Sequence, residues 1–149
     1  VDNDIPARTG NYYYKLAGGS ISKALGPGKY KLEYWAQGSP PGLSGGTIAS
    51  VRTSTADRNG WILYEKEVAT SSAVTLTLSG TAFVDELRIY PATAQMTTYT
   101  YDFMNGITSV SDPANFCQAY EYDGLGRLKW ISDDKGNIVK TVDYGYKGN

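Results

Sequence analysis

The stretch KYKLEYWAQ, residues 29–37, decides the fold class of the N-terminal part of the chain. Apolar and polar side chains alternate along it, as they do along a β-strand with one buried face. The face that we expect to meet a core carries Tyr30, Leu32, Tyr34 and Ala36. The opposite face carries Lys31, Glu33, Trp35 and Gln37, among which Trp35 is the one large aromatic side chain.

Similar short alternations continue on both sides of this stretch. They predict further strands at 12–16, 47–54, 61–68, 74–79 and 83–90. Glycine, proline and asparagine predict turns between them, and a loop over 38–46. No amphipathic helix of useful length is predicted. Five or six strands at short spacing predict an all-β protein, with an antiparallel β-sandwich over residues 1–92.

Tyrosine pairs recur in the last third of the chain, at 99 and 101, 120 and 122, and 144 and 146. The first two pairs run into an aspartate, giving YTYD at 99–102 and YEYD at 120–123, an offset of 21 residues. We expect each unit to be a β-hairpin, so that residues 93–149 form a hairpin segment. Tyrosines in a fixed phase favour a packed ladder over a ligand site, with aspartate in the turn.

A single hairpin is marginally stable in water, so these hairpins need something to pack against. They are expected to stack on one another, on the sandwich, or on further repeats in a longer chain. If they dock on the sandwich, Trp130 and the tyrosines are the expected contacts. Because Val1 is not an initiator methionine, we expect the sequence to be part of a larger parent chain.

Composition excludes several classes of function. The 149 residues have a net charge of −1 and no basic stretch that would follow a phosphate backbone, so nucleic acid is not an expected partner. No apolar run reaches the roughly 20 residues of a membrane helix, so no membrane insertion is expected. Histidine is absent and Cys117 is the only cysteine, which excludes histidine-dependent nucleophiles, histidine metal sites and an internal disulfide.

Four segments in this order resemble the galactose-binding-like jelly roll, the fold of many carbohydrate-binding modules. They are ARTG at 7–10, PGKYKLEYWA at 27–36, GW at 60–61 and FVDELRIYP at 83–91. The resemblance implies a jelly-roll sandwich that binds carbohydrate. It also implies one structural calcium ion, because the aspartate that matches Asp85 helps to bind calcium in that family. The candidates for a second acidic ligand are Asp2, Asn3 and Asp4.

The nonamer YEYDGLGRL at 120–128, followed by Asp133 and by GN at 136–137, resembles the YD repeats of Rhs-type proteins. The first unit departs from that pattern, with NGI at 105–107 in place of GRL, and YGY at 144–146 is a stub. The autocleavage motif of many Rhs cores is absent, so we carry over no protease activity. The resemblance implies a secreted or surface-exposed bacterial protein.

The outer face of the 29–37 strand supplies the predicted ligand residues. Trp35 can stack on the C–H face of a sugar while Lys31, Glu33 and Gln37 bond its hydroxyl groups. The alternative is that a loop or the C-terminal hairpins cover Trp35, since exposed large aromatics are uncommon without a partner. Trp61 and Trp130 are expected to be packing residues.

Asp85 shares a strand face with Phe83, Leu87 and Ile89, which places a carboxylate on an apolar face. Burying it bare would cost several kcal/mol, so it is expected either to bind calcium or to accept bonds from backbone N–H groups. The other carboxylates available for chemistry are Glu33, Glu65, Glu67 and Glu86, and nothing in their spacing pairs them as glycoside hydrolysis requires. We therefore expect no enzyme. Two functions remain open: a carbohydrate-binding module, and a structural connector without a small ligand.

Overall fold

The computed structural model describes residues 5–145, which form β-strands and turns without a helix. The all-β prediction is confirmed. The chain divides into two compact units, Val1–Met96 and Thr97–Asn149. The expected boundary, between residues 92 and 93, lies just before this division.

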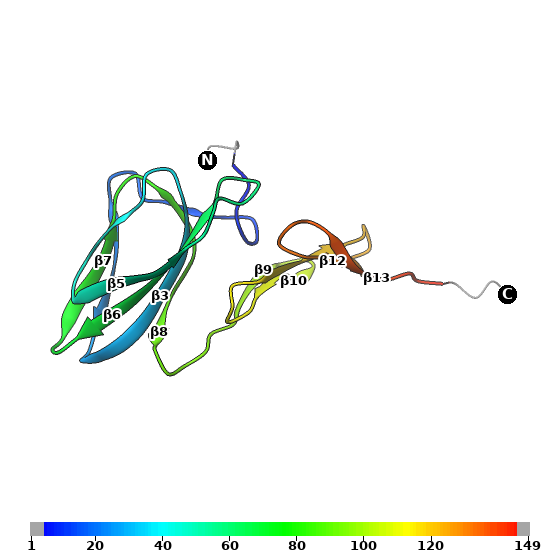
Figure 1. Cartoon of the computed structure of the whole chain (residues 1–149). Helices are drawn as coiled ribbons and strands as arrows, with labels where there is room; N and C mark the ends of the chain where they lie inside the picture. Colours follow the sequence, from blue (N-terminus) through cyan, green and yellow to red (C-terminus); the bar gives the residue numbers. More distant parts are fainter. Residues whose placement is uncertain (1–4, 146–149) are drawn as a thin grey trace. The chain divides into compact units, whose positions relative to one another are not determined.

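The first unit is an antiparallel β-sandwich, as predicted (Figure 1). The five-stranded sheet has the order β1 (Tyr14–Lys15), β8 (Phe83–Pro91), β3 (Gly28–Gln37), β6 (Ile62–Thr70) and β5 (Thr47–Thr53). The three-stranded sheet has the order β2 (Ser20–Leu25), β7 (Val74–Ser79) and β4 (Gly42–Ser44).

Two of these strands were not predicted. β4 lies inside the stretch expected to be a loop, and β2 lies between two expected turns. Both pair with β7, so that Leu43 and Ile21 each lie opposite Leu78. Both strands are short and contain serine, so local propensity is weak and the strand state depends on pairing with distant residues.

The main core lies between the two sheets. The predicted inward face of β3 is confirmed, because Leu32, Tyr34 and Ala36 are buried and Tyr30 packs against the same cluster. Tyr34 stacks on Tyr64 with ring centroids 5.3 Å apart. Burial, followed by the neighbouring Tyr64, raises the pKa of Tyr34 to about 12. The alternation along β3 therefore identified the core face of this strand correctly.

The second unit is a five-stranded antiparallel meander in which every strand pairs with the next along the chain. Its strands are β9 (Thr98–Asp102), β10 (Gly106–Ser111), β11 (Cys117–Tyr122), β12 (Leu128–Ser132) and β13 (Ile138–Thr141). The predicted hairpins are present. Cys117 is buried, and Trp130 is half-buried with the Lys129 ammonium 4.2 Å from its ring centroid. That the hairpins dock on the sandwich stays a prediction.

Three of the turns in the meander have the same hydrogen bonds. In each, an aspartate carboxylate accepts the backbone N–H groups two and four residues later, and the residue three positions later has a positive φ. The aspartates are Asp112, Asp123 and Asp133. The structural repeat is thus a single strand and turn, about half of the 21-residue period that the tyrosines indicate.

Tyrosine hydroxyl groups tie neighbouring hairpins together. Tyr122 donates to the carbonyl oxygen of Ile107 at 2.7 Å, and Tyr144 donates to that of Leu128 at 3.1 Å. Tyr99 and Tyr101 instead stack on each other at the exposed edge, with ring centroids 6.4 Å apart. Tyr146, of the third pair, lies outside the described residues.

Candidate functional site

The outward face of the five-stranded sheet brings together charged residues from distant parts of the sequence. In the register of β3 and β6, Lys31 lies opposite Glu67, and Glu33 lies opposite Glu65. On the far side of β6, Arg52 of β5 lies opposite Glu65. The sequence offered no sign of this grouping because strand register is a non-local property.

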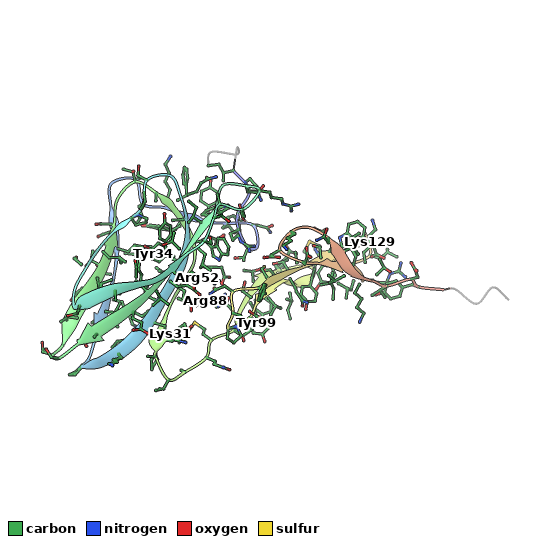
Figure 2. All side chains as sticks on the ribbon, in the orientation of Figure 1. Lys31, Tyr34, Arg52, Arg88, Tyr99 and Lys129 are labelled. Atoms are coloured by element: carbon green, nitrogen blue, oxygen red, sulfur yellow. The ribbon has the colours of Figure 1, made fainter. Side chains whose placement is uncertain are left out.

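A cavity of about 100 Å³ opens among these side chains. We call it the outer-face pocket, and its lining residues are Lys31, Glu33, Val51, Glu65, Lys66 and Glu67. Val51 lies at an irregularity in the pairing of β5 with β6 and is 61% exposed. Figure 2 labels Lys31 on β3 and Arg52 on β5, and both strands contribute lining residues to the pocket.

The charges of the outer-face pocket are only partly paired. Arg52 forms an ion pair with Glu65, and the hydrogen bond to Glu65 raises the pKa of Arg52. The side chains of Lys31 and Glu67 make no hydrogen bond or ion pair with any residue between 5 and 145. A cation and a carboxylate on facing positions are thus available to a ligand.

Glu33 is a buried residue at the bottom of the outer-face pocket. Its Oε1 accepts a 2.8 Å hydrogen bond from the Tyr90 hydroxyl, while its buried Oε2 has no hydrogen-bond partner among the described residues and lies 3.9 Å from Arg88. Arg88 is itself fully buried and bonds to Glu86 at 2.9 Å. Burial and then the bond to Glu33 raise the pKa of Tyr90 to about 12. Glu33 is therefore the buried acidic residue beneath the outer-face pocket.

Trp35 lies at the other end of β3, in a separate aromatic cluster with Trp61 and Leu63. Its side chain is 8% exposed, and the Arg8 guanidinium lies 4.2 Å from its ring centroid. The Trp61 indole donates to the Pro6 carbonyl at 3.0 Å, which fixes the N-terminal segment over the cluster. Trp35 therefore has no exposed ring face on which a sugar could stack. The structure agrees with the alternative expectation, in which another part of the chain covers this side chain.

Gln37 belongs to the same end of the strand as Trp35. Its Nε2 donates to the Asn59 carbonyl at 2.5 Å, and its Oε1 is buried without a hydrogen-bond partner among the described residues. Of the four predicted ligand residues, Lys31 and Glu33 therefore line one pocket, whereas Trp35 and Gln37 pack at a distance along β3. The alternation of side chains along β3 predicted which residues face outward. It could not predict which half of that face the N-terminal segment covers.

Asp85 is held by hydrogen-bond donors. Its Oδ2 accepts the backbone N–H groups of Arg8 at 2.7 Å and Thr9 at 3.0 Å, and its Oδ1 accepts that of Glu86 at 2.8 Å. Burial raises the pKa of Asp85, and these bonds oppose the rise. N–H groups directed at a carboxylate take the places that a cation would occupy.

The described residues contain no group of three or more acidic or cysteine side chains that could hold a metal ion. Asp2, Asn3 and Asp4, the candidates for a second calcium ligand, lie outside the described residues. Between residues 5 and 145 there is no helix of the length and hydrophobicity that a membrane crossing requires. No protein-family model matches the chain, and no curated protein sequence matches it significantly.

Proposed function

We propose that the chain is a non-catalytic, carbohydrate-binding module of a larger, secreted or surface-exposed bacterial protein of the Rhs type. The sandwich binds the sugar at the outer-face pocket, and the YD-repeat hairpins are scaffold. The observation that carries this proposal is the outer-face pocket itself, where Lys31 and Glu67 face each other and neither has a hydrogen-bond or ion-pair partner among residues 5–145.

The chemistry of the pocket suits a polyhydroxylated ligand. A sugar hydroxyl both donates and accepts, so neighbouring hydroxyls can donate to Glu67 and accept from Lys31. Directly opposed residues of an antiparallel pair have Cβ atoms about 5 Å apart, close enough for one sugar ring to reach both. The exposed Val51 side chain adds an apolar contact for the ring carbons. Binding breaks no internal ion pair of either charged residue.

The same pocket does not suit hydrolysis. Glycoside hydrolysis needs a general acid and a second carboxylate on opposite sides of the scissile bond. Glu33 of β3 and Glu65 of β6 lie opposite each other. One carboxylate oxygen of Glu33 accepts a hydrogen bond from Tyr90 and the other is buried. Glu65 forms an ion pair with Arg52. With both acids engaged in this way, the pocket is a binding site.

The test is titration calorimetry against a panel of neutral and acidic oligosaccharides chosen from a glycan array. Lys31→Met and Glu67→Gln each remove one charged hydrogen bond to the ligand, worth about 1.5–3 kcal/mol, and so weaken binding about tenfold or more. The control is Lys23→Met on β2, in the other sheet, which leaves affinity unchanged. A wild-type chain that binds none of the panel contradicts the proposal.

A second candidate function, a structural connector without a small ligand, is favoured by the burial of Trp35. The connector accounts for the burial of Trp35 and Trp61, and for the tyrosine and aspartate bonds that fix the meander. It predicts no binding by the wild-type sandwich to any glycan. The same calorimetry therefore separates the two functions.

A further inference from the structure

A second cavity lies where β3 begins, and it is larger than the outer-face pocket. Its volume is about 440 Å³, within the range of small-molecule sites. We call it the strand-end pocket, and its lining residues are Gly28, Lys29, Gly46, Thr47, Ala69, Thr70, Ser71, Ser72 and Val74. None of the residues predicted from the sequence as ligands lines this cavity.

Strand register brings Lys29 of the strand-end pocket close to Lys31 of the outer-face pocket. Lys29 lies opposite Ala69, which in turn lies opposite Thr47, and the next outward-facing pair along β3 and β6 is Lys31 with Glu67. The two lysines are thus about 7 Å apart along the strand. At this spacing, one ligand longer than a single sugar ring can reach both lysines.

The shape of the strand-end pocket depends on a close approach by the turn before β5. Gly46 has a φ of 79°, and a Cβ atom there would lie 2.9 Å from the Ala69 carbonyl oxygen. Glycine therefore brings this turn directly against β6, where it lines the pocket beside Thr47. A larger residue at this position would move the turn away from β6.

The chemistry of the strand-end pocket is that of an anion site. Lys29 is the only charged lining residue, and its ammonium makes no hydrogen bond or ion pair within residues 5–145. The hydroxyls of Thr47, Ser71 and Ser72 likewise have no hydrogen-bond partner in that part of the chain. No carboxylate lines this cavity, whereas three line the outer-face pocket. One ammonium and several free hydroxyls fit a carboxylate or sulfate group.

We propose that the strand-end pocket binds the acidic group of an acidic oligosaccharide, while the adjoining sugar ring occupies the outer-face pocket. This inference rests on the proposed carbohydrate-binding function. A carboxylate of a uronic acid and a sulfate ester present the same anionic oxygens to Lys29. The acidic group sits at the Lys29 end because Glu65 and Glu67 repel it from the other.

Calorimetry with four matched ligands tests the inference: a neutral trisaccharide, its uronic-acid form, its singly sulfated form and a non-sugar dicarboxylate. The wild type binds at least one acidic trisaccharide about tenfold tighter than the neutral one, and the preference shrinks as salt is raised. Whether the uronic or the sulfated form gains more identifies the source of the anion. The dicarboxylate binds weakly, because it lacks the hydroxyls that the outer-face pocket requires.

Variants separate this inference from the function on which it rests. Lys29→Met abolishes the preference for the acidic trisaccharide, whereas Glu67→Gln weakens the binding of the acidic and the neutral trisaccharide alike. Lys23→Met is the control for loss of one surface charge. The inference is overturned, and the proposed function stands, if Lys29→Met leaves the affinity for the acidic trisaccharides unchanged. The same holds if the wild type binds the neutral trisaccharide as tightly as the acidic ones. If no trisaccharide binds, both fall.

Discussion

Arg88 carries its charge inside the protein. Its side chain is 1% exposed, bonds to Glu86 at 2.9 Å and lies 3.9 Å from Glu33. A buried charge is expensive unless it is paired. Arg88 is therefore the counter-charge that allows Glu33 to remain beneath the outer-face pocket, and it links the stability of β8 to the chemistry of β3 (Figure 2).

Replacing Arg88 tests that link. Arg88→Met leaves the Glu33 and Glu86 carboxylates buried without their cation and lowers the free energy of unfolding by about 3–5 kcal/mol. Arg52→Met is the matched control, because Arg52 is 56% exposed in its pair with Glu65, and such pairs contribute about 0–1 kcal/mol. Urea denaturation measures both. Equal losses in the two variants would show that the buried pair has no special role.

Asp85 gives the second prediction at this scale. Asp85→Ala removes the acceptor of the Arg8, Thr9 and Glu86 backbone N–H groups and lowers the free energy of unfolding by about 1–3 kcal/mol. Because these donors hold the carboxylate, adding a calcium chelator leaves the melting temperature of the wild type unchanged. A metal bound only by the folded state would raise that temperature. A clear fall on chelation contradicts this account of Asp85.

At the scale of the element, the aspartate turns specify the meander. Asp112, Asp123 and Asp133 make equivalent bonds, and the residue three positions later is Asn115, Gly126 or Gly136, each with a positive φ. Glycine and asparagine are the residues that adopt this conformation most readily. The turn chemistry is therefore local and repeats along the chain.

Two glycines of one turn provide a matched test. Gly126 has a φ of 73°, so Gly126→Ala strains the backbone and destabilises the second unit by about 1 kcal/mol. Gly124 has no positive φ, and a Cβ atom there meets nothing within 4 Å, so Gly124→Ala is neutral or slightly stabilising. Thermal melts of the two variants report the difference. Equal melting temperatures would contradict the turn assignment.

Asp85 in the sandwich and the turn aspartates Asp123 and Asp133 in the meander contribute to the pH dependence of stability with opposite signs. The backbone N–H of Arg127, with its side chain, lowers the pKa of Asp123, and the side chain of Asn137 lowers that of Asp133. Both groups therefore stabilise the folded meander above the ordinary value of 3.8, and this stability is lost as the pH falls through their lowered pKa values. Burial raises the pKa of Asp85, so its contribution to the sandwich is full at low pH and falls as the pH rises through that value.

Acid titration followed by amide NMR measures this difference. As the pH falls below 3.8, the signals of β11 and β12 weaken because Asp123 and Asp133 become protonated, and protonation of Asp85 costs the sandwich nothing. Asp123→Asn, which cannot be protonated, flattens the acid dependence of that turn. Loss of the β3 and β8 signals before those of β11 and β12 contradicts this assignment.

At the scale of the whole molecule, the local patterns were readable from the sequence. Alternation over 29–37 identified the inward face of β3, and the tyrosine spacing identified the hairpins. Both depend on residues close together in the chain. The short strands β2 and β4 were not predicted, because pairing with β7, and not their own composition, makes them strands.

Only half of the candidate site could be predicted from the sequence, for a different physical reason. Lys31 and Glu33 were predicted as outward-facing ligands, and both line the outer-face pocket. Trp35 shares their face, yet residues far away in the sequence cover it, as the Arg8 contact shows. Glu67 was missed because only the register of β3 with β6 brings it opposite Lys31. Non-local contacts of this kind leave no periodic signal in a single sequence.

The central claim is that the sandwich binds carbohydrate on the outward face of its five-stranded sheet. Amide NMR of the isotope-labelled chain, titrated with the uronic-acid trisaccharide, tests it most directly. The account predicts shift changes in β3, β5 and β6 around Lys31 and Glu67 and among the residues that line the strand-end pocket, with none in the hairpin unit. In Glu67→Gln the same changes require a higher sugar concentration, because binding is weaker. No shift change with any sugar, or changes confined to the tyrosines of the meander, would contradict it.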